Sequence, residues 1–294
     1  MPILNMNQVT KTFGTLKALD AVNLSVDPGE VYGFIGPNGA GKTTAIRVLL
    51  GILKATSGQA TLFGRDAWQD AVELHRRVAY VPGEVSLWPN LTGGEVIDLF
   101  VRLRRGNKDS ARRELLQRFD LDPTKKCRTY SKGNRQKVAL VAAFATEADL
   151  YILDEPTSGL DPLMEEVFQD CVLEVKSRGK SVLLSSHILS EVEKLCDKVS
   201  IIRRGRIIET GTLAQLRHLT RTQVHAVTRQ PLTGLQAMPF LHDLHQEGQR
   251  LSCSVEADHL GSLVTLLNDH GLMHLECAPP TLEQLFMSHY EREG

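Results

Sequence analysis

The sequence predicts an α/β protein with a mostly parallel core sheet, an N-terminal antiparallel β region, a helical subdomain and a small α+β domain at its end. Three observations predict this class. An apolar strand precedes a helix at residues 31–51, and from Leu150 a strand, a helix and a second strand follow in order, which indicates a parallel sheet with crossover helices. Residues 88–146 carry apolar residues at helical spacing. After about Leu219 the pattern changes to shorter strands and two helices, which indicates a separate domain.

The individual elements follow from hydrophobic pattern and from glycines that end helices. In the first part of the chain, strands are expected at residues 3–9, 21–26, 31–36, 150–153 and 181–186. Helices are expected there at residues 42–51, 95–103, 111–119 and 163–178. In the last part, strands are expected at 223–229, 250–255 and 273–277, and helices at 259–270 and 281–289. The expected domains are residues 1–219, with a helical subdomain at about 88–146, and residues 220–294.

Composition excludes several classes of protein. The chain has 294 residues and a formal net charge of -1, which argues against a dedicated nucleic-acid binder. It has no apolar run long enough to span a bilayer, and its start lacks the basic and apolar regions of a signal peptide. We therefore expect a soluble protein that reaches a membrane only through a partner. The five cysteines include no C-x-x-C pair, so reduced thiols are expected rather than a zinc site or disulfides.

A glycine-rich loop, GPNGAGKT at residues 36–43, matches the phosphate-binding pattern G-x-x-x-x-G-K-[ST] at every fixed position. An apolar strand precedes it and a helix follows, so a chance match is disfavoured and a P-loop NTPase is predicted. Backbone amides at the start of a helix favour bound anions. Lys42 would neutralise the β- and γ-phosphates, and the Thr43 hydroxyl would bind Mg²⁺. The residues expected to bind nucleotide here are Gly36, Pro37, Asn38, Gly39, Ala40, Gly41, Lys42, Thr43 and Thr44.

Two acids, Asp154 and Glu155, end the apolar strand of LYILDEP. Ligands of open α/β sheets bind at the carboxyl ends of strands, where adjacent residues point in different directions. Asp154 therefore suits the Mg²⁺ shell, directly or through water, and Glu155 suits a base that polarises the attacking water. His187 ends the next strand at the same sheet edge, where a neutral imidazole can contact the γ-phosphate and water. We expect Lys42, Glu155 and His187 to be the catalytic residues.

Through these motifs, residues 1 to about 219 resemble the ATP-binding subunit of an ABC transporter. Phe13 matches the aromatic that stacks on adenine, and the glycine-rich loop and LYILDEP match the Walker A and Walker B motifs. SGLD at residues 158–161 matches the D-loop, and His187 matches the switch histidine. The segment PPTLEQLFMSHYE, residues 279–291, resembles the ending of the ATPases paired with ABC-2 type drug and antibiotic exporters.

Residues 130–137, YSKGNRQK, stand where the family has its signature motif, usually LSGGQ. Ser131 and Gly133 match, and the resemblance implies that they cap the nucleotide of an opposite subunit. Lys132 replaces a glycine, and it either adds charge toward the phosphate or faces solvent. A second departure follows the strand-like RVAYVP. Gly83 stands where the family has a glutamine that touches Mg²⁺ and the membrane subunit, and either Glu84 substitutes or the coupling differs.

The resemblance implies an ATPase that uses ATP and Mg²⁺, forms a homodimer with two composite sites, and drives export through a separate ABC-2 type permease. It implies a cytoplasmic location on the inner face of the cell membrane, with no nucleic-acid partner. The alternative is a soluble ABC-type ATPase acting on nucleic acid or ribosomes, which the basic stretch from Arg102 to Arg118 favours slightly. A GTPase or nucleotide kinase shares the phosphate loop, but no N-K-x-D guanine motif is present.

Overall fold

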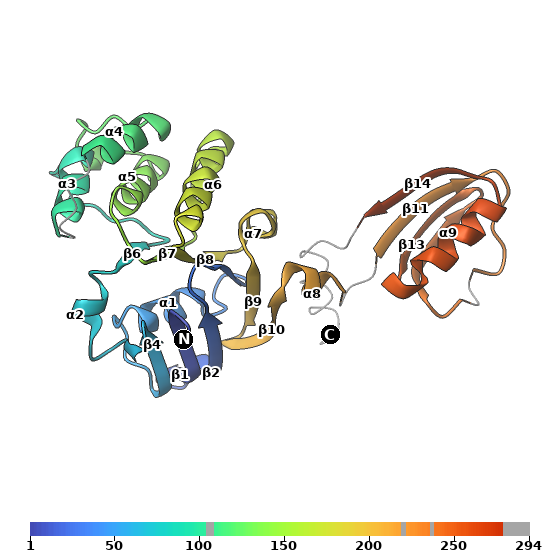
Figure 1. The fold of residues 1–294 in the computed structure, drawn as a ribbon, viewed down its shortest axis with the longest axis horizontal. Helices are drawn as coiled ribbons and strands as arrows, with labels where there is room; N and C mark the ends of the chain where they lie inside the picture. The colour runs from blue at the N-terminus through green and yellow to red at the C-terminus, as the bar shows by residue number, and fades with distance from the viewer. Residues whose placement is uncertain (104–108, 219–221, 236–237, 279–294) are drawn as a thin grey trace. The chain divides into compact units, whose positions relative to one another are not determined.

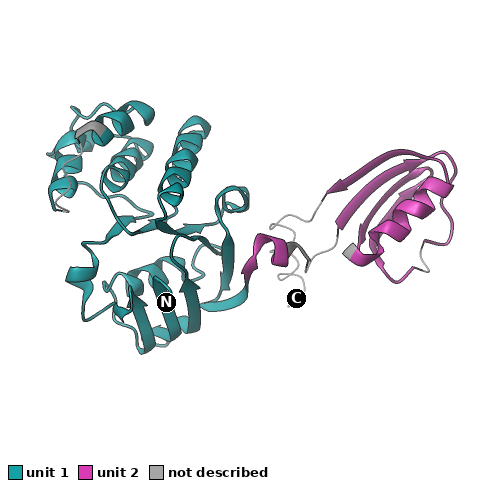
Figure 2. Cartoon of the chain, viewed as in Figure 1, with its two compact units in different colours: residues 1–210 teal, residues 211–294 magenta. Residues whose placement is uncertain are grey.

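The computed structural model describes residues 1–103, 109–218, 222–235 and 238–278. Contacts divide the chain into two compact units, residues 1–210 and 211–294 (Figures 1 and 2). The division falls before the short helix α8 (Leu213–His218), whereas the boundary expected from sequence follows it. The assignment of residues 1–219 and 220–294 to two functional domains stays a prediction.

An antiparallel sheet of order β2-β1-β4-β5 forms the N-terminal part of the first unit. Its strands are β1 (Leu4–Phe13), β2 (Leu16–Val26), β4 (Ser57–Leu62) and β5 (Arg65–Asp66). Buried apolar side chains recur along β2 at alternate positions from Val22 to Val26, as expected of a strand with one face in the core. This sheet is the predicted antiparallel β region.

The core sheet has the order β10-β9-β3-β8-β7-β6, and its inner strands pair in parallel. The strands are β3 (Val31–Ile35), β6 (Val78–Val81), β7 (Leu150–Asp154), β8 (Ser181–Ser186), β9 (Lys198–Arg203) and β10 (Arg206–Thr212). Every residue of β3, β7 and β8 is buried, which explains why the middle of each strand is apolar. Because β3, β7 and β8 run in parallel, the phosphate loop, the two acids and His187 all follow the same edge.

Helices cover this sheet and build the helical subdomain (Figure 1). They are α1 (Lys42–Leu49), α2 (Ala71–Leu74), α3 (Gly93–Leu103), α4 (Asp109–Arg118), α5 (Lys132–Phe144), α6 (Pro162–Ser177) and α7 (Leu189–Leu195). Local capping fixes several starts. Thr92 and Glu95 bond reciprocally to each other's backbone amides at α3, and Asp161 caps α6 ahead of a proline at its first position.

The second unit carries an antiparallel sheet of order β12-β13-β11-β14 and helix α9 (Leu260–Asp269). Its strands are β11 (Thr222–Thr228), β12 (Leu241–Glu247), β13 (Arg250–Val255) and β14 (Leu272–Ala278). Sequence analysis did not predict β12, because it is an edge strand whose sequence LHDLHQE has two apolar residues. The helix expected at 281–289 lies outside the described residues.

Candidate active site

The phosphate loop, which connects β3 and α1, lines a cavity of about 520 Å³. Two glycines in it are required by close backbone approach. A Cβ on Gly36 would lie 2.3 Å from the Ile202 carbonyl oxygen, and Gly41 has a φ of 115° while a Cβ there would lie 2.8 Å from the Ala18 carbonyl oxygen. The packing around this loop therefore explains why the motif has glycine at positions 36 and 41.

Lys42 is 4% exposed, and its ammonium group is held from two sides. Its Nζ donates to the carbonyl oxygens of Gly36, at 2.6 Å, and Pro37, at 3.3 Å. The same atom lies 3.1 Å from Oε1 of Glu155. Phosphate oxygens entering the loop would compete with Glu155 for this lysine.

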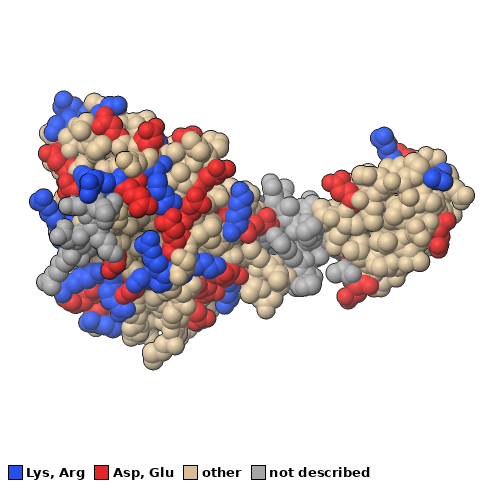
Figure 3. Space-filling view, turned by 45° about the horizontal axis from the view of Figure 1, so that its top comes forward, with Lys and Arg blue, Asp and Glu red and all other residues tan. Residues whose placement is uncertain are grey.

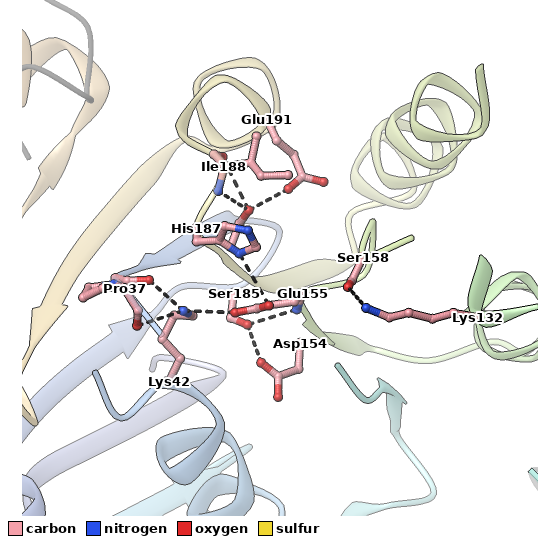
Figure 4. Close-up of polar contacts among 12 residues, drawn as sticks. Pro37, Lys42, Lys132, Asp154, Glu155, Ser158, Ser185, His187, Ile188 and Glu191 are labelled. Carbon is pink, nitrogen blue, oxygen red and sulfur yellow. Dashed lines mark hydrogen bonds and ion pairs between the residues drawn. The ribbon is translucent and has the colours of Figure 1, made fainter. Parts of the chain in front are cut away.

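Glu155 lies between Lys42 and His187 (Figure 4). Its Oε2 is 3.4 Å from Nδ1 of His187, while its Oε1 faces Lys42. The backbone of Glu155 has a φ of 47°, in a region that non-glycine residues rarely adopt, and its amide donates to the backbone and side-chain oxygens of Ser185. Backbone strain of this kind concentrates at functional sites. The three residues that sequence analysis expected to be catalytic thus form one continuous line of contacts.

Asp154 is 1% exposed and accepts a hydrogen bond from the Ser185 hydroxyl. Gly83 lies against it, since a Cβ on Gly83 would be 3.1 Å from the Asp154 carbonyl oxygen. Burial raises the pKa of nearby Tyr80 to about 12, and the negative charge of Asp154 adds to this effect. Glu84, the residue weighed as a substitute for the missing glutamine, is exposed. Gly83 therefore provides close backbone packing on Asp154 and no side-chain contact.

Few protein ligands are needed to hold Mg²⁺ at this site. No group of three or more metal-ligating side chains occurs in the described part of the chain. At nucleotide sites Mg²⁺ takes most of its ligands from phosphate and water, so one hydroxyl and one carboxylate suffice. Asp154 offers a buried carboxylate at the strand end, and Thr43 lines the phosphate-loop cavity. These two residues would hold the ion, which would supply positive charge to the phosphate oxygens.

The mouth of the cavity is lined by Phe13, Leu16 and Arg204. Phe13 is 47% exposed, and the Lys11 ammonium lies 5.1 Å from the centre of its ring. An exposed aromatic ring at the edge of a cavity is suited to stacking on a base. This position agrees with the expected contact between Phe13 and adenine.

Ser131 and Gly133 are not among the residues that line this cavity. They begin α5, where the Ser131 hydroxyl accepts a hydrogen bond from the Asn134 amide at 3.2 Å. Gly133 packs on the loop after β7, because a Cβ there would lie 2.4 Å from the Gly159 carbonyl oxygen. The candidate nucleotide-binding residues therefore fall into two groups, one around the phosphate loop and one at the start of α5.

Lys132 neither faces the phosphate loop of its own chain nor extends freely into solvent. Its Nζ donates to the Ser158 hydroxyl at 2.7 Å (Figure 4). Four residues later, the buried Gln136 side chain donates to the Pro156 carbonyl oxygen at 2.9 Å. The first turns of α5 are thus bonded to the segment that directly follows Glu155.

Several residues of this site carry no signal in the sequence. Ser185 holds both acids, and Ser186 and Glu191 support the turn that carries His187. Serines at the end of a strand and a glutamate in a charged helix are common, and Ser185 lies 31 residues from Asp154 in the sequence. No short sequence motif therefore distinguishes these residues.

The comparisons with known proteins agree with this geometry. The family model described as ABC transporter matches residues 19–158. The daunorubicin resistance ATP-binding protein DrrA3 of Streptomyces coeruleorubidus is 33% identical and aligns over 97% of this chain and 94% of its own length. The chain belongs to the ABC transporter ATP-binding subunits.

Other relatives support the same family. The bacitracin transport ATP-binding protein BcrA of Bacillus licheniformis is 38% identical, over 70% of this chain and 69% of its own. A solved ATP-binding subunit of an ABC transporter, 33% identical, has a TM-score of 0.68 and covers 74% of this chain and 92% of its own. The predicted family, P-loop fold and ATPase class are confirmed by these findings.

Proposed function

We propose that this ABC ATPase is the motor of an exporter: two copies bind ATP and Mg²⁺, close on each other, hydrolyse ATP and move a separate ABC-2 type permease. The observation that carries this proposal is the line from Lys42 through Glu155 to His187 at the phosphate-loop cavity. The relatives DrrA3 and BcrA, which are named for daunorubicin resistance and bacitracin transport, support the export class.

In this proposal, different side chains of the site have different roles in ATP binding and hydrolysis. Lys42 and the loop amides neutralise the β- and γ-phosphates, and Phe13 stacks on the adenine. Glu155 accepts the proton of a water whose oxygen bonds to the γ-phosphorus while the bond to the β–γ bridging oxygen breaks. His187 orients that water and the γ-phosphate. Glu155 is free to act as the base once phosphate oxygens replace it at Lys42.

A second copy of the chain completes each site. Ser131 and Gly133 stand at a helix start apart from the cavity, where the exposed Ser131 side chain and the Gly133 amide can meet the γ-phosphate bound by the other subunit. Because a symmetric dimer presents the same surfaces twice, one pairing creates two equivalent ATP sites. ATP then joins the subunits, and its hydrolysis releases them.

Support for a membrane partner comes from an apolar cavity of about 280 Å³ beside the loop after β6. Its lining includes Val85 and Leu87 of that loop and Phe100 of α3. The nearby Trp88 ring is 52% exposed and lies 6.3 Å from the Phe100 ring. Exposed apolar surface of this kind marks a binding site for another protein. We assign it to an apolar segment of the permease, since the resemblance places this loop against the membrane subunit.

The described helices include none that is both long and apolar enough to cross a bilayer. From the family resemblance we propose that the chain lies on the cytoplasmic face of the cell membrane, attached through the permease. The distribution of charged side chains gives little support to the alternative, an ATPase that acts on nucleic acid or ribosomes. Arg112 pairs with Asp98 and Arg118 with Glu174, and Figure 3 shows basic and acidic side chains intermixed over the first unit on the face in view.

The hydrolytic part of the proposal is tested by Glu155→Gln. This variant keeps the shape of the side chain but cannot accept a proton, so it should bind ATP, lose most turnover and form an ATP-dependent dimer. Size-exclusion chromatography with and without ATP, together with phosphate release, measures all three. Normal ATP hydrolysis by Glu155→Gln would refute the assignment of the base.

The transport part is tested by co-expression with a multi-spanning membrane protein encoded beside this chain. The two should co-purify, and Phe100→Asp should abolish co-purification while ATP hydrolysis by the isolated chain is kept. Leu173→Asp is the matched control, because Leu173 is similarly exposed but lies on α6, outside the apolar cavity. Stable association with ribosomes or DNA, and with no membrane protein, would refute the transport function.

A further inference from the structure

Glu191 has a buried carboxyl group that lies next to the turn that carries His187. It is 5% exposed and belongs to the core-facing side of α7 together with Val192 and Leu195. Burial raises its pKa to about 7. A carboxyl group at a core-facing position costs folding free energy unless its hydrogen bonds compensate. The bonds that Glu191 makes therefore indicate why an acid stands there.

Ser186 connects this carboxyl group to the His187 turn. Its hydroxyl donates to Oε2 of Glu191 at 2.8 Å and accepts the Ile188 amide proton at 2.9 Å (Figure 4). Ser186 and Ile188 are the residues on either side of His187. The carboxyl group thus fixes the direction of the serine hydroxyl, and the hydroxyl closes the backbone turn around the histidine.

His187 needs such support because packing restrains it little. Its side chain is 49% exposed, and its Nδ1 lies 3.4 Å from Glu155, which is at the edge of hydrogen-bonding range. By contrast, α7 is firmly anchored, since Val192 and Leu195 are 0% and 2% exposed. A rigid helix therefore holds Glu191, and Glu191 can hold the turn.

We propose that Glu191 is a positioning residue for His187 and acts through the Ser186 hydroxyl. This inference rests on the proposed role of His187 in ATP hydrolysis. Glu191 itself is not among the residues that line the phosphate-loop cavity. Its loss should therefore change the rate of hydrolysis and leave ATP binding intact.

The test measures kcat and KM for ATP in single and double variants. Glu191→Ala should lower kcat about tenfold or more, because a small misplacement of a catalytic group has effects of this order. KM should stay unchanged. Ser186→Ala should do the same, and Glu191→Gln should recover most of the turnover, since its amide oxygen can still accept the serine proton. Lys194→Ala, at an exposed position of the same helix, is the matched control and should behave as the wild type.

The His187→Ala background separates positioning from a general loss of folding. There, Glu191→Ala should cause no further loss of kcat, because the group through which it acts is already gone. Additive losses, or equal damage from Glu191→Gln and Glu191→Ala, would overturn the inference while leaving the proposed function intact. Full turnover in His187→Ala would overturn both the role of His187 and this inference, and absence of hydrolysis in the wild-type chain would overturn the proposed function itself.

Discussion

The packing of Gly133 against the loop after Glu155 predicts the effect of one added methyl group. In Gly133→Ala the new Cβ would lie 2.4 Å from the Gly159 carbonyl oxygen. Backbone must then move by about 1 Å to restore ordinary contact between these atoms. Overpacking of this kind costs about 3 kcal/mol at its upper range, where backbone meets backbone. The gain of alanine over glycine in a helix offsets about 1 kcal/mol, which leaves a net loss of about 2 kcal/mol.

For a unit of this size, such a loss lowers the melting temperature by about 4–8 °C. Turnover should fall as well, since α5 would separate from the segment that follows Glu155. Scanning calorimetry and a steady-state ATPase assay measure these effects. Gly261→Ala is the control, because this helical glycine of α9 has nothing within 4 Å of an added Cβ and should not lose stability. An unchanged melting temperature and turnover in Gly133→Ala would refute the close packing of α5 on Gly159.

Two further predictions concern Lys132 and Glu191. Lys132→Gly and Ser158→Ala each remove one end of an exposed hydrogen bond worth about 1 kcal/mol, so each should lower kcat up to about fivefold, and the double variant should be no worse. A higher KM for ATP in Lys132→Gly alone would show instead that the lysine contacts phosphate. Burial raises the folded-state pKa of Glu191 from 4.5 to about 7, so ionisation destabilises the fold: the penalty is absent below about pH 4.5 and complete above about pH 7. As pH rises through this window, Glu191→Gln should therefore gain up to about 3 kcal/mol of stability over the wild type. Urea unfolding measures the stability of both proteins. A stability difference that does not change with pH would contradict the raised pKa.

The parts of the site that could be predicted are those set by local sequence and by strand direction. The phosphate loop is a continuous motif whose backbone must bend tightly, and it needs glycine at fixed places. Asp154, Glu155 and His187 were identified because parallel strands bring their carboxyl ends to one edge. The same reasoning predicted β3, β7 and β8, which are buried along their whole length. It missed β9 and β10 of the core sheet and also β12, an edge strand with a mostly polar sequence.

The sequence by itself thus determined which chemical groups are present and at which edge of the sheet they stand. The tertiary structure decided how they are paired. Glu155 contacts Lys42 across more than a hundred residues, Lys132 bonds to Ser158, and Gly83 packs on Asp154 where a glutamine was expected. The burial of Glu191 likewise depends on how α7 packs on the sheet. Such contacts join residues far apart in the chain, so they depend on the position of whole strands and helices, which local patterns do not specify.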